Sequence, residues 1–418
     1  MILLISLLLL FALSVPIAVA LGLVSLLGLI MIGDVPLTLV SQRMVTAVNS
    51  FPLLAVPFFI LAGNLMERGG LSRRLIEFVS ALVGTLSGGL ALAAVLTCMF
   101  FAAISGSSAA TAAAVGAVLI PAMQEKGYAK EFSSAVVASS GEMGVIIPPS
   151  IPMILYGVLA SVSIGDMFLA GIYPGILVAG SVMLVAYYIS RRRGYKGNAE
   201  ISFAHLLRSF GGALLALLMP FIILGGIYGG VFTPTEAAVV AVVYGLVVGG
   251  LVYREFGLKD MPGILVQSAR TTSVIMIIIA SASLLGWILT REQMPQAIAG
   301  AVLGLSESPL VYLLLVNILL LIVGMFFESS AALVILTPIL LPIATSLGID
   351  PVHFGVIMIV NLAVGMVTPP LGVNLFITCN IAGIGIETIT RSLLPFFVIL
   401  ILDILIITYV PAISLSLP

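Results

Sequence analysis

Charged residues are scarce in this chain of 418 residues. They make up only 8% of it, whereas 61% of its residues are hydrophobic and the mean hydropathy is +1.31. A soluble domain carries about 25% charged residues. The composition therefore excludes a soluble enzyme and is typical of a polytopic membrane protein. The formal net charge of -1 gives no bulk electrostatic attraction for nucleic acid, so no nucleic-acid partner is expected.

Cysteine and histidine are equally rare, with two residues of each. Both cysteines lie in apolar runs without metal-ligand spacing, which excludes a disulfide framework. We expect His205 in a linker and His353 after a turn, both at the surface. An intramembrane serine hydrolase built on Ser107 or Ser108 would need an adjacent base, and neither histidine falls in a core span. We therefore expect a protein that is not an enzyme and that uses no cofactor.

Long hydrophobic runs are abundant. A helix needs about 20 apolar residues to cross the hydrocarbon core of a bilayer. We expect spans near 2–32, 46–66, 131–160, 167–190, 207–231, 236–253, 262–290, 354–383 and 393–413. The first run is too long for a signal peptide, and two short segments within it are the alternative to one span.

Two further apolar regions, about 83–122 and 297–345, are interrupted in their middles by the polar stretches 105–108 and 328–330. A re-entrant helical hairpin with its tip shielded by protein satisfies the backbone at such a break. Two full spans are the alternative. A hairpin at 83–122 places four basic clusters on the same side of the membrane. Short loops rich in Lys and Arg stay in the cytoplasm, so this side is predicted to be cytoplasmic. These clusters lie at 68–74, 126–130, 191–196 and 254–259.

The chain resembles itself at one constant offset along the sequence, which is typical of internal repeats. This offset pairs Pro148, Pro149, Pro121, Pro174, Ser108 and Gly144 with Pro369, Pro370, Pro342, Pro395, Ser329 and Gly365. Five predicted spans lie between a segment of the first copy and its counterpart in the second copy. Because five is an odd number, the second copy is predicted to have the opposite orientation in the membrane. Broken helices at matching places in two halves indicate the binding site of a transporter.

The predicted fold is therefore an all-α polytopic membrane protein with inverted repeats. The first repeat covers 1–190, with a hairpin at about 83–122 and a broken helix at about 131–160. A cytoplasmic linker covers 191–206. The second repeat covers 207–418, with a hairpin at about 297–345 and a broken helix at about 354–383.

The first interruption, I-S-G-S-S-A-A-T at 104–111, combines hydroxyl groups with a glycine. An unwound tip also frees carbonyl oxygens, which suit a hard cation such as Na⁺. The helix that begins after it presents N-terminal amides, which favour an anion. Close packing of helices through small residues is the alternative interpretation.

The second feature is the diproline of G-V-I-I-P-P at 144–149. Consecutive prolines remove two N–H donors and force the preceding residue out of the helical region. Carbonyls at 144–147 therefore lose their intrahelical partners. An ion or a neighbouring Ser or Thr can replace those partners, and a plain proline kink is the alternative.

The counterparts in the second half add polar side chains. Asn361, Thr368 and Asn374 lie beside the second diproline, and Glu328 is a carboxylate within an apolar region. A charge there is costly, which makes Glu328 a functional candidate. The alternative is that Glu328 lies at a hairpin tip that is exposed to water. Glu236 has the spacing of a capping box with Thr233 at a helix start.

Several stretches together resemble one known family. They are S-F-P-L-L-A-V-P-F-F-I-L-A-G-N-L-M at 50–66, G-G-L-S-R-R-L at 69–75, I-S-G-S-S-A-A-T at 104–111, I-I-P-P-S-I at 146–151, L-A-G-I-Y-P-G at 169–175, G-V-F-T-P-T-E-A-A at 230–238 and T-P-P-L-G-V-N-L-F at 368–376. They resemble the large membrane subunit of tripartite ATP-independent periplasmic (TRAP) transporters, the DctM/SiaM-type permease.

The resemblance implies a multi-pass protein of the bacterial inner membrane that works by an elevator mechanism, with a transport domain moving against a scaffold. It implies Na⁺-driven import of an organic acid, such as a C4-dicarboxylate, sialic acid or another carboxylate. It also implies two partners: a small four-helix membrane subunit, expected as a separate chain, and a periplasmic binding protein. The alternative is a standalone divalent-anion/Na⁺ symporter.

The resemblance also implies site residues. The first sodium site comprises Ser105, Gly106, Ser107, Ser108, Gly144, Ile147 and Ser150. The second comprises Gly324, Glu328, Ser329, Gly365, Thr368 and Leu371. The substrate is expected near Ser107, Ser108, Thr111, Pro149, Ser330, Pro370 and Asn374. Na⁺ is the only metal expected.

Overall fold

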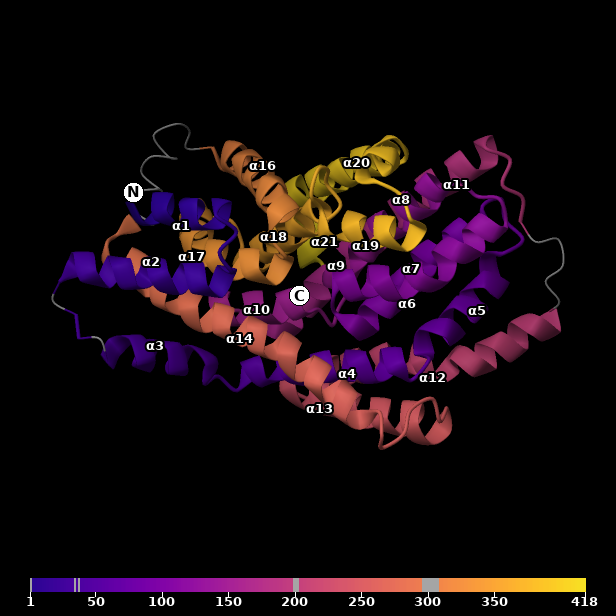
Figure 1. Ribbon diagram of the computed structural model, residues 1–418, viewed down its shortest axis with the longest axis horizontal. Helices are drawn as coiled ribbons and strands as arrows, with labels where there is room; N and C mark the ends of the chain where they lie inside the picture. Colours follow the sequence, from indigo (N-terminus) through magenta and orange to yellow (C-terminus); the bar gives the residue numbers. More distant parts are fainter. Residues whose placement is uncertain (1, 34, 37, 198–202, 295–307) are drawn as a thin grey trace.

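The computed structural model describes the chain except residues 1, 34, 37, 198–202 and 295–307 (Figure 1). Every regular element in the described part is helical. The elements of the first half are α1 (Ile2–Ala12), α2 (Ile17–Ile32), α3 (Thr38–Val48), η1 (Pro52–Leu54), α4 (Ala55–Arg68), α5 (Leu71–Val83), α6 (Gly89–Ser105), α7 (Ser108–Glu125), α8 (Lys130–Gly141), α9 (Met143–Ile146), α10 (Ile151–Ala160) and α11 (Ile164–Arg192). Those of the second half are α12 (Phe203–Tyr228), α13 (Pro234–Gly245), the π-helix η2 (Leu246–Val252), α14 (Met261–Arg291), α16 (Pro309–Phe326), α17 (Ser329–Ser346), α18 (Pro351–Gly365), α19 (Val373–Ala382), α20 (Ile386–Tyr409) and α21 (Ala412–Leu415).

Eight helical stretches in the described part are long and apolar enough to cross a membrane. A ninth candidate is the pair formed by α3 and the stretch Pro52–Arg68, which meet at a bend of 65°. The first apolar run contains two helices, α1 and α2, so the two-segment alternative is correct there. The all-α membrane fold predicted from the sequence is thus confirmed.

Two pairs of helices occupy the interrupted regions. α6 and α7 pack together and are separated by Gly106 and Ser107, while α16 and α17 pack together across Phe327 and Glu328. α7 and α17 correspond at both ends under the repeat offset of the sequence. In Figure 1, α6 and α7 extend from the middle of the molecule toward one end, and α17 extends toward the other. Their re-entry from opposite faces of a membrane stays a prediction, and residues 297–307 of the second predicted hairpin lie outside the described residues.

Each predicted broken helix contains an irregular stretch at its diproline. Residues 147–150 separate α9 from α10, and residues 366–372 separate α18 from α19. The Pro148-Pro149 and Pro369-Pro370 peptide bonds are both cis. Both prolines of each pair lie between two helical segments, at corresponding places of the two halves.

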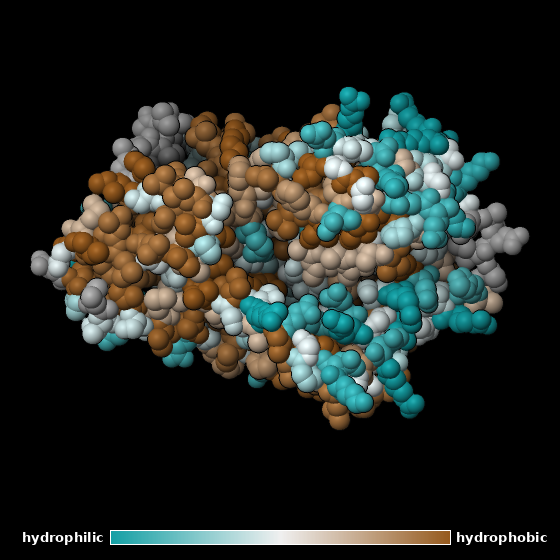
Figure 2. Space-filling view, in the orientation of Figure 1, coloured by the Kyte–Doolittle hydropathy of each residue, from teal (hydrophilic) through white to brown (hydrophobic). Residues whose placement is uncertain are grey.

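Polar side chains gather at one end of the molecule. Figure 2 shows hydrophilic residues over the end that carries α5 and the C-terminal end of α11, and hydrophobic residues over the opposite end. Arg73 and Arg74 pair with Glu255 at 3.3 and 2.9 Å, and Tyr195 accepts a hydrogen bond from the Ala129 amide at 3.0 Å. These contacts join the basic clusters in two pairs, and the location of all four clusters on one side of a membrane stays a prediction.

Two local expectations have opposite outcomes. Thr233 and Glu236 form the predicted capping box at the start of α13. His205 is exposed as expected, but the surface location predicted for His353 is wrong. His353 is buried in the first turns of α18, and its Nε2 lies 3.2 Å from the Thr408 carbonyl of α20. The reason is tertiary: α20 covers the start of α18, and the local sequence does not reveal that contact.

Candidate functional site

A cavity of about 590 Å³ lies between the turns of the α6–α7 and α16–α17 pairs on one side and the helices α4 and α14 on the other. Both turns line it, through Ser105, Gly106 and Ser107 on one side and Glu328 and Ser330 on the other. We call residues 105–108 the first tip and residues 327–330 the second tip. One cavity thus brings together stretches from the two halves that are far apart in the sequence.

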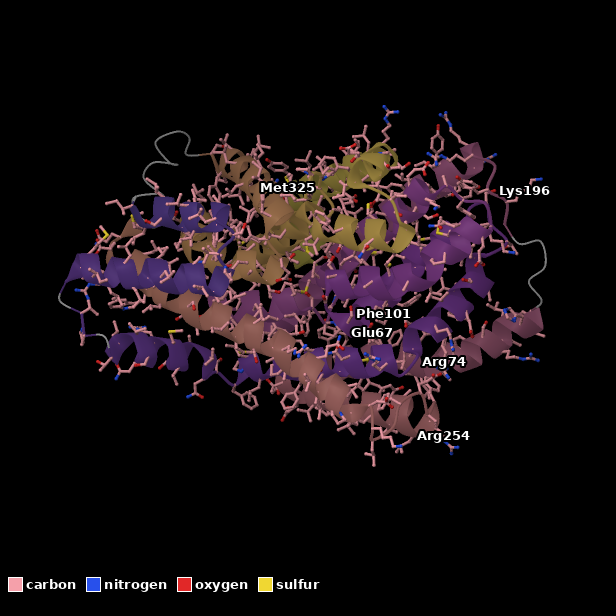
Figure 3. The ribbon with its side chains drawn as sticks, viewed as in Figure 1. Glu67, Arg74, Phe101, Lys196, Arg254 and Met325 are labelled. Carbon is pink, nitrogen blue, oxygen red and sulfur yellow. The ribbon has the colours of Figure 1, made fainter. Side chains whose placement is uncertain are left out.

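The opposite wall of the cavity is the face of α4 that carries Ile60, Gly63, Asn64 and Glu67, together with a face of α14. The spacing of these four residues places them on one side of a helix. A Cβ on Gly63 would lie 3.5 Å from the Ser105 carbonyl oxygen, so α4 packs closely on the first tip. In the view of Figure 3, the labels of Glu67 of α4 and Phe101 of α6 both fall near the middle of the molecule.

Polar groups of the first tip form a small network. The hydroxyls of Ser105 and Thr111 lie 2.8 Å apart, and the Thr111 hydroxyl donates to the Ser107 carbonyl at 2.8 Å. The Ser107 hydroxyl accepts from the Ala110 amide at 3.4 Å and caps α7. Gly106 has φ of +60°, a left-handed conformation that glycine adopts without steric cost. The tip therefore presents hydroxyl and carbonyl oxygens at the start of a helix.

The first broken helix packs against this tip through Gly144. A Cβ on Gly144 would lie 2.7 Å from the Thr111 hydroxyl and closer still to the Ser107 carbonyl oxygen. The Gly106 carbonyl accepts a hydrogen bond from the Ile151 amide at 3.3 Å. Residues predicted for the first sodium site are thus adjacent in space, and their oxygens are of the hard type that Na⁺ prefers.

The remaining residues of that predicted site lie around the break. Ser150 donates to the Val145 carbonyl at 2.6 Å, so a serine replaces one partner that the diproline removes. The side chain of Ile147 packs against Gly175 of α11, which leaves only its backbone for a cation. The side chain of Ser108 is buried and accepts a hydrogen bond at 2.7 Å from the side-chain amide of Asn374.

The second tip differs in one respect that the sequence did not reveal. The carboxylate of Glu328 caps α17, accepting from the amides of Ser330 at 2.9 Å and Ala331 at 3.4 Å and from the Ser330 hydroxyl at 3.0 Å. The N-terminal amides that could attract an anion at this tip are therefore already paired with an acidic side chain. The two tips are chemically unequal.

The second broken helix contacts its hairpin through a pair of glycines. A Cβ on Gly365 would lie 2.5 Å from the Gly324 Cα. The Ser329 hydroxyl points to the sulfur of Met366 at 3.2 Å, and the Thr368 hydroxyl donates to the Val364 carbonyl at 2.8 Å. These four predicted residues lie together at the contact between α16, α17 and α18.

Leu371, also predicted for the second sodium site, has a side chain that is 39% exposed beyond the diproline, so only its backbone is available for a cation. Asn361, which the sequence placed beside this break, donates to Asn317 at 2.9 Å and ties α18 to α16. The role of the second site in binding Na⁺ stays a prediction.

Of the residues predicted to contact substrate, Ser107 and Ser330 line the cavity. Ser108, Thr111 and Asn374 are buried behind its surface. The other two are prolines outside its described lining: Pro149 is buried with its carbonyl facing Gly106, and Pro370 is exposed. The structure thus places two of the seven at the cavity surface and three in the layer that supports it.

Asn374 gives a first testable prediction. Its side chain joins α19 of the second half to α7 and α8 of the first, through Ser108 and the Ala138 carbonyl. Asn374→Leu should lower the free energy of unfolding by about 1–2 kcal/mol because these buried groups lose a partner. Denaturant titration of the purified protein measures this loss. Asn380→Leu, at an exposed position of the same helix, is the matched control, and an equal effect of both variants would contradict the assigned role.

Sequence reasoning missed the wall opposite the tips. Its polar residues are Asn64, Glu67, Gln267 and Thr271, and the Asn64 amide donates to Ser268 at 2.7 Å, which joins α4 to α14. A local signal was present: Gly63, Asn64 and Glu67 share one face of an otherwise apolar helix. The contribution of α14 to this wall depends on tertiary packing, which the local sequence does not show.

The fold defines a class of protein: an all-helical, multi-pass membrane protein with a cavity between its two tips and the wall formed by α4 and α14. The solved structure of the YdaH transporter of Alcanivorax borkumensis has the same fold, with a TM-score of 0.64, 19% sequence identity and coverage of 91% of this chain and 90% of that chain.

A family model described as "Tripartite ATP-independent periplasmic transporter, DctM component" matches residues 4–413. The chain belongs to this family of TRAP transporter large permeases. It is therefore a transport protein rather than an enzyme, and a multi-pass protein of the inner membrane, as the sequence predicted.

Three relatives illustrate the family. The C4-dicarboxylate large permease DctM of Pseudomonas aeruginosa is 48% identical over 88% of this chain and 86% of its own length. The sialic acid large permease SiaM of Vibrio cholerae is 40% identical over 98% of this chain and 96% of its own length. The isethionate permease protein DctMQ of Oleidesulfovibrio alaskensis is 48% identical over 96% of this chain, which spans 64% of that relative.

Proposed function

We propose that this chain is the large permease subunit of a TRAP transporter that imports an organic acid together with Na⁺. One observation carries the proposal: the two tips face a single cavity of about 590 Å³, and each of the two helix pairs that carry the tips packs on a broken helix through a glycine. Relatives named for C4-dicarboxylate, sialic acid and isethionate transport support an organic acid as the cargo.

Sodium fits the chemistry of both tips. Around the first tip, the Ser107 carbonyl and the hydroxyls of Ser105 and Thr111 lie together beside Gly144. Around the second, the Ser329 hydroxyl at the start of α17 points to the sulfur of Met366, which lies between Gly365 and Thr368 in the chain. Hard oxygen donors suit Na⁺, and broken helices in membranes supply such donors. Bound Na⁺ would hold each tip against its broken helix and so shape the cavity for the acid.

The arrangement also suits an elevator. In this mechanism α4 and α14 belong to the scaffold, and the two tips with their broken helices move as the transport domain. The cavity lies on the boundary between these two groups of helices, so a relative movement would carry its contents across the membrane. A small membrane subunit would extend the scaffold, and a periplasmic binding protein would deliver the acid, as the word tripartite in the family description suggests.

Thr368 offers a direct test of sodium coupling. Its hydroxyl already donates to the Val364 carbonyl, which leaves its lone pairs free for a cation. Thr368→Ala should raise the Na⁺ concentration for half-maximal uptake by about threefold to tenfold. The measurement is uptake into proteoliposomes that contain the chain with the small subunit, supplied with the binding protein. The exposed Thr388 provides the control Thr388→Ala.

Two results of that experiment would count against the proposal. Uptake at the same rate without a Na⁺ gradient would show that transport is not coupled to sodium. Uptake by the chain alone, with no binding protein, would favour a standalone anion/Na⁺ symporter.

A further inference from the structure

We propose that the acid carried through this cavity has a single anionic group and a hydrogen-bond donor, either a hydroxyl or an ammonium group, and that Glu67 recognises this donor. The inference rests on the proposed function and names the class of cargo for the same site.

Two carboxylates, Glu67 and Glu328, line the cavity, while no Lys or Arg is present among the described residues of its lining. Two sodium ions at the proposed sites would offset these two negative charges. An acid with one anionic group would then add one negative charge that no cation offsets, and a dicarboxylate would add two. A dianion in this cavity would therefore face stronger repulsion than an acid with one anionic group.

The two carboxylates are not equivalent. Glu328 is already paired with the amides of Ser330 and Ala331 and with the Ser330 hydroxyl. The side chain of Glu67 makes no hydrogen bond or ion pair with any described residue. Its carboxylate faces the cavity with its acceptor capacity unused, and an acceptor of this kind favours a donor on the cargo.

The helix that carries Glu67 strengthens this preference. Glu67 is the penultimate residue of α4, where the C-terminal end of the helix dipole adds partial negative charge. The first tip has the opposite character, because α7 begins there with a neutral serine cap. The first tip therefore suits the anionic group of the cargo, and the acidic wall that carries Glu67 suits its hydrogen-bond donor.

A series of related probes tests the inference by binding to the full-length chain in lipid nanodiscs, with and without Na⁺. Ethanesulfonate, 2-hydroxyethanesulfonate and 2-aminoethanesulfonate share a skeleton and carry no donor, a hydroxyl and an ammonium group respectively, the last being a zwitterion. Succinate is the dianion. At least one donor-bearing sulfonate should bind about tenfold more tightly than ethanesulfonate and than succinate in the presence of Na⁺.

The variant Glu67→Gln should produce a crossover. It should weaken binding of the preferred donor-bearing probe by about tenfold and strengthen binding of succinate, because it removes a negative charge and keeps the size of the side chain. A merely structural role of Glu67 would weaken every probe alike. Glu77→Gln, at an exposed position of α5 outside the described cavity lining, makes the same change of charge and should leave all affinities unchanged.

The outcomes separate this inference from the proposed function. Na⁺-dependent binding that favours succinate, or that shows no preference for a donor, would overturn the inference and leave a sodium-coupled permease standing. An absence of binding by any donor-bearing probe would overturn it as well. Binding that is independent of Na⁺ for every probe would instead contradict the proposed function.

Discussion

Gly144→Ala is expected to reduce Na⁺-dependent uptake by at least about tenfold, because the added methyl group cannot fit between the first broken helix and the first tip. Its Cβ would lie 2.7 Å from the Thr111 hydroxyl and closer to the Ser107 carbonyl oxygen. The closest obstacle is backbone, so a change of rotamer cannot relieve the overlap. The tip must move away, and the proposed donors of the first sodium site then separate.

Proteoliposome uptake over a range of Na⁺ concentrations measures this effect. Gly180→Ala is the matched control, since a Cβ at Gly180 of α11 would meet nothing within 4 Å. Uptake by the control should match the wild type, and both variants should be recovered from the membrane at similar levels. Normal Na⁺ dependence in Gly144→Ala would show that the contact between Gly144 and the tip is irrelevant to ion binding.

Gly365→Ala should have a comparable effect in the second half. Its Cβ would lie 2.5 Å from the Gly324 Cα and 2.7 Å from the Gly324 carbonyl carbon, so α16 and α18 would be forced apart. Two close helix backbones in a membrane depend on small residues at their contact. The expected result is a loss of Na⁺-dependent uptake of about tenfold or more, with the second sodium site disrupted rather than the first.

Binding of ²²Na⁺ to the purified variants separates the two sites. Gly144→Ala and Gly365→Ala should each lower the number of bound ions, and the double variant should bind none. Gly225→Ala is the control for α12, because a Cβ there would have no neighbour within 4 Å. Equal sodium binding by the wild type and the double variant would exclude both sites.

The sequence predicted the helix interruptions that glycine, serine and proline cause. The first tip and the diprolines break the helices where expected, because Gly, Ser and Pro act locally on the backbone. The start of α7 at Ser108 and of α17 at Ser329 also agrees with the repeat offset, which pairs these two serines. These features are coded within a short distance of where they act.

Other features were beyond the sequence because they depend on contacts between distant segments. The wall of the cavity forms only where α4 packs on α14, as in the hydrogen bond between Asn64 and Ser268. The burial of His353 depends on the Thr408 carbonyl. The capping of α17 by Glu328 is local, but the sequence left open whether this carboxylate lies at a wet tip or in a functional site. The structure shows that it caps the helix and also lines the cavity.

The helix α5 was also missed. Its 13 residues are too few for a span, and only one face is apolar, with Leu71, Leu75 and Val79 buried. A search for spanning helices passes over such a segment, because an amphipathic helix is recognised by periodicity rather than by mean hydropathy. The charged residues of its other face include Arg73, which pairs with Glu255.

Binding of Na⁺ is expected at both contacts between a helix pair and its broken helix. Cryo-electron microscopy of the full-length chain in nanodiscs, with maps in NaCl and in choline chloride at matched resolution, tests it. Density is expected beside the Ser107 carbonyl and Gly144, and beside Thr368 and Gly365, in the sodium map only. Identical maps at both places, with no density between the oxygens in either salt, would contradict it.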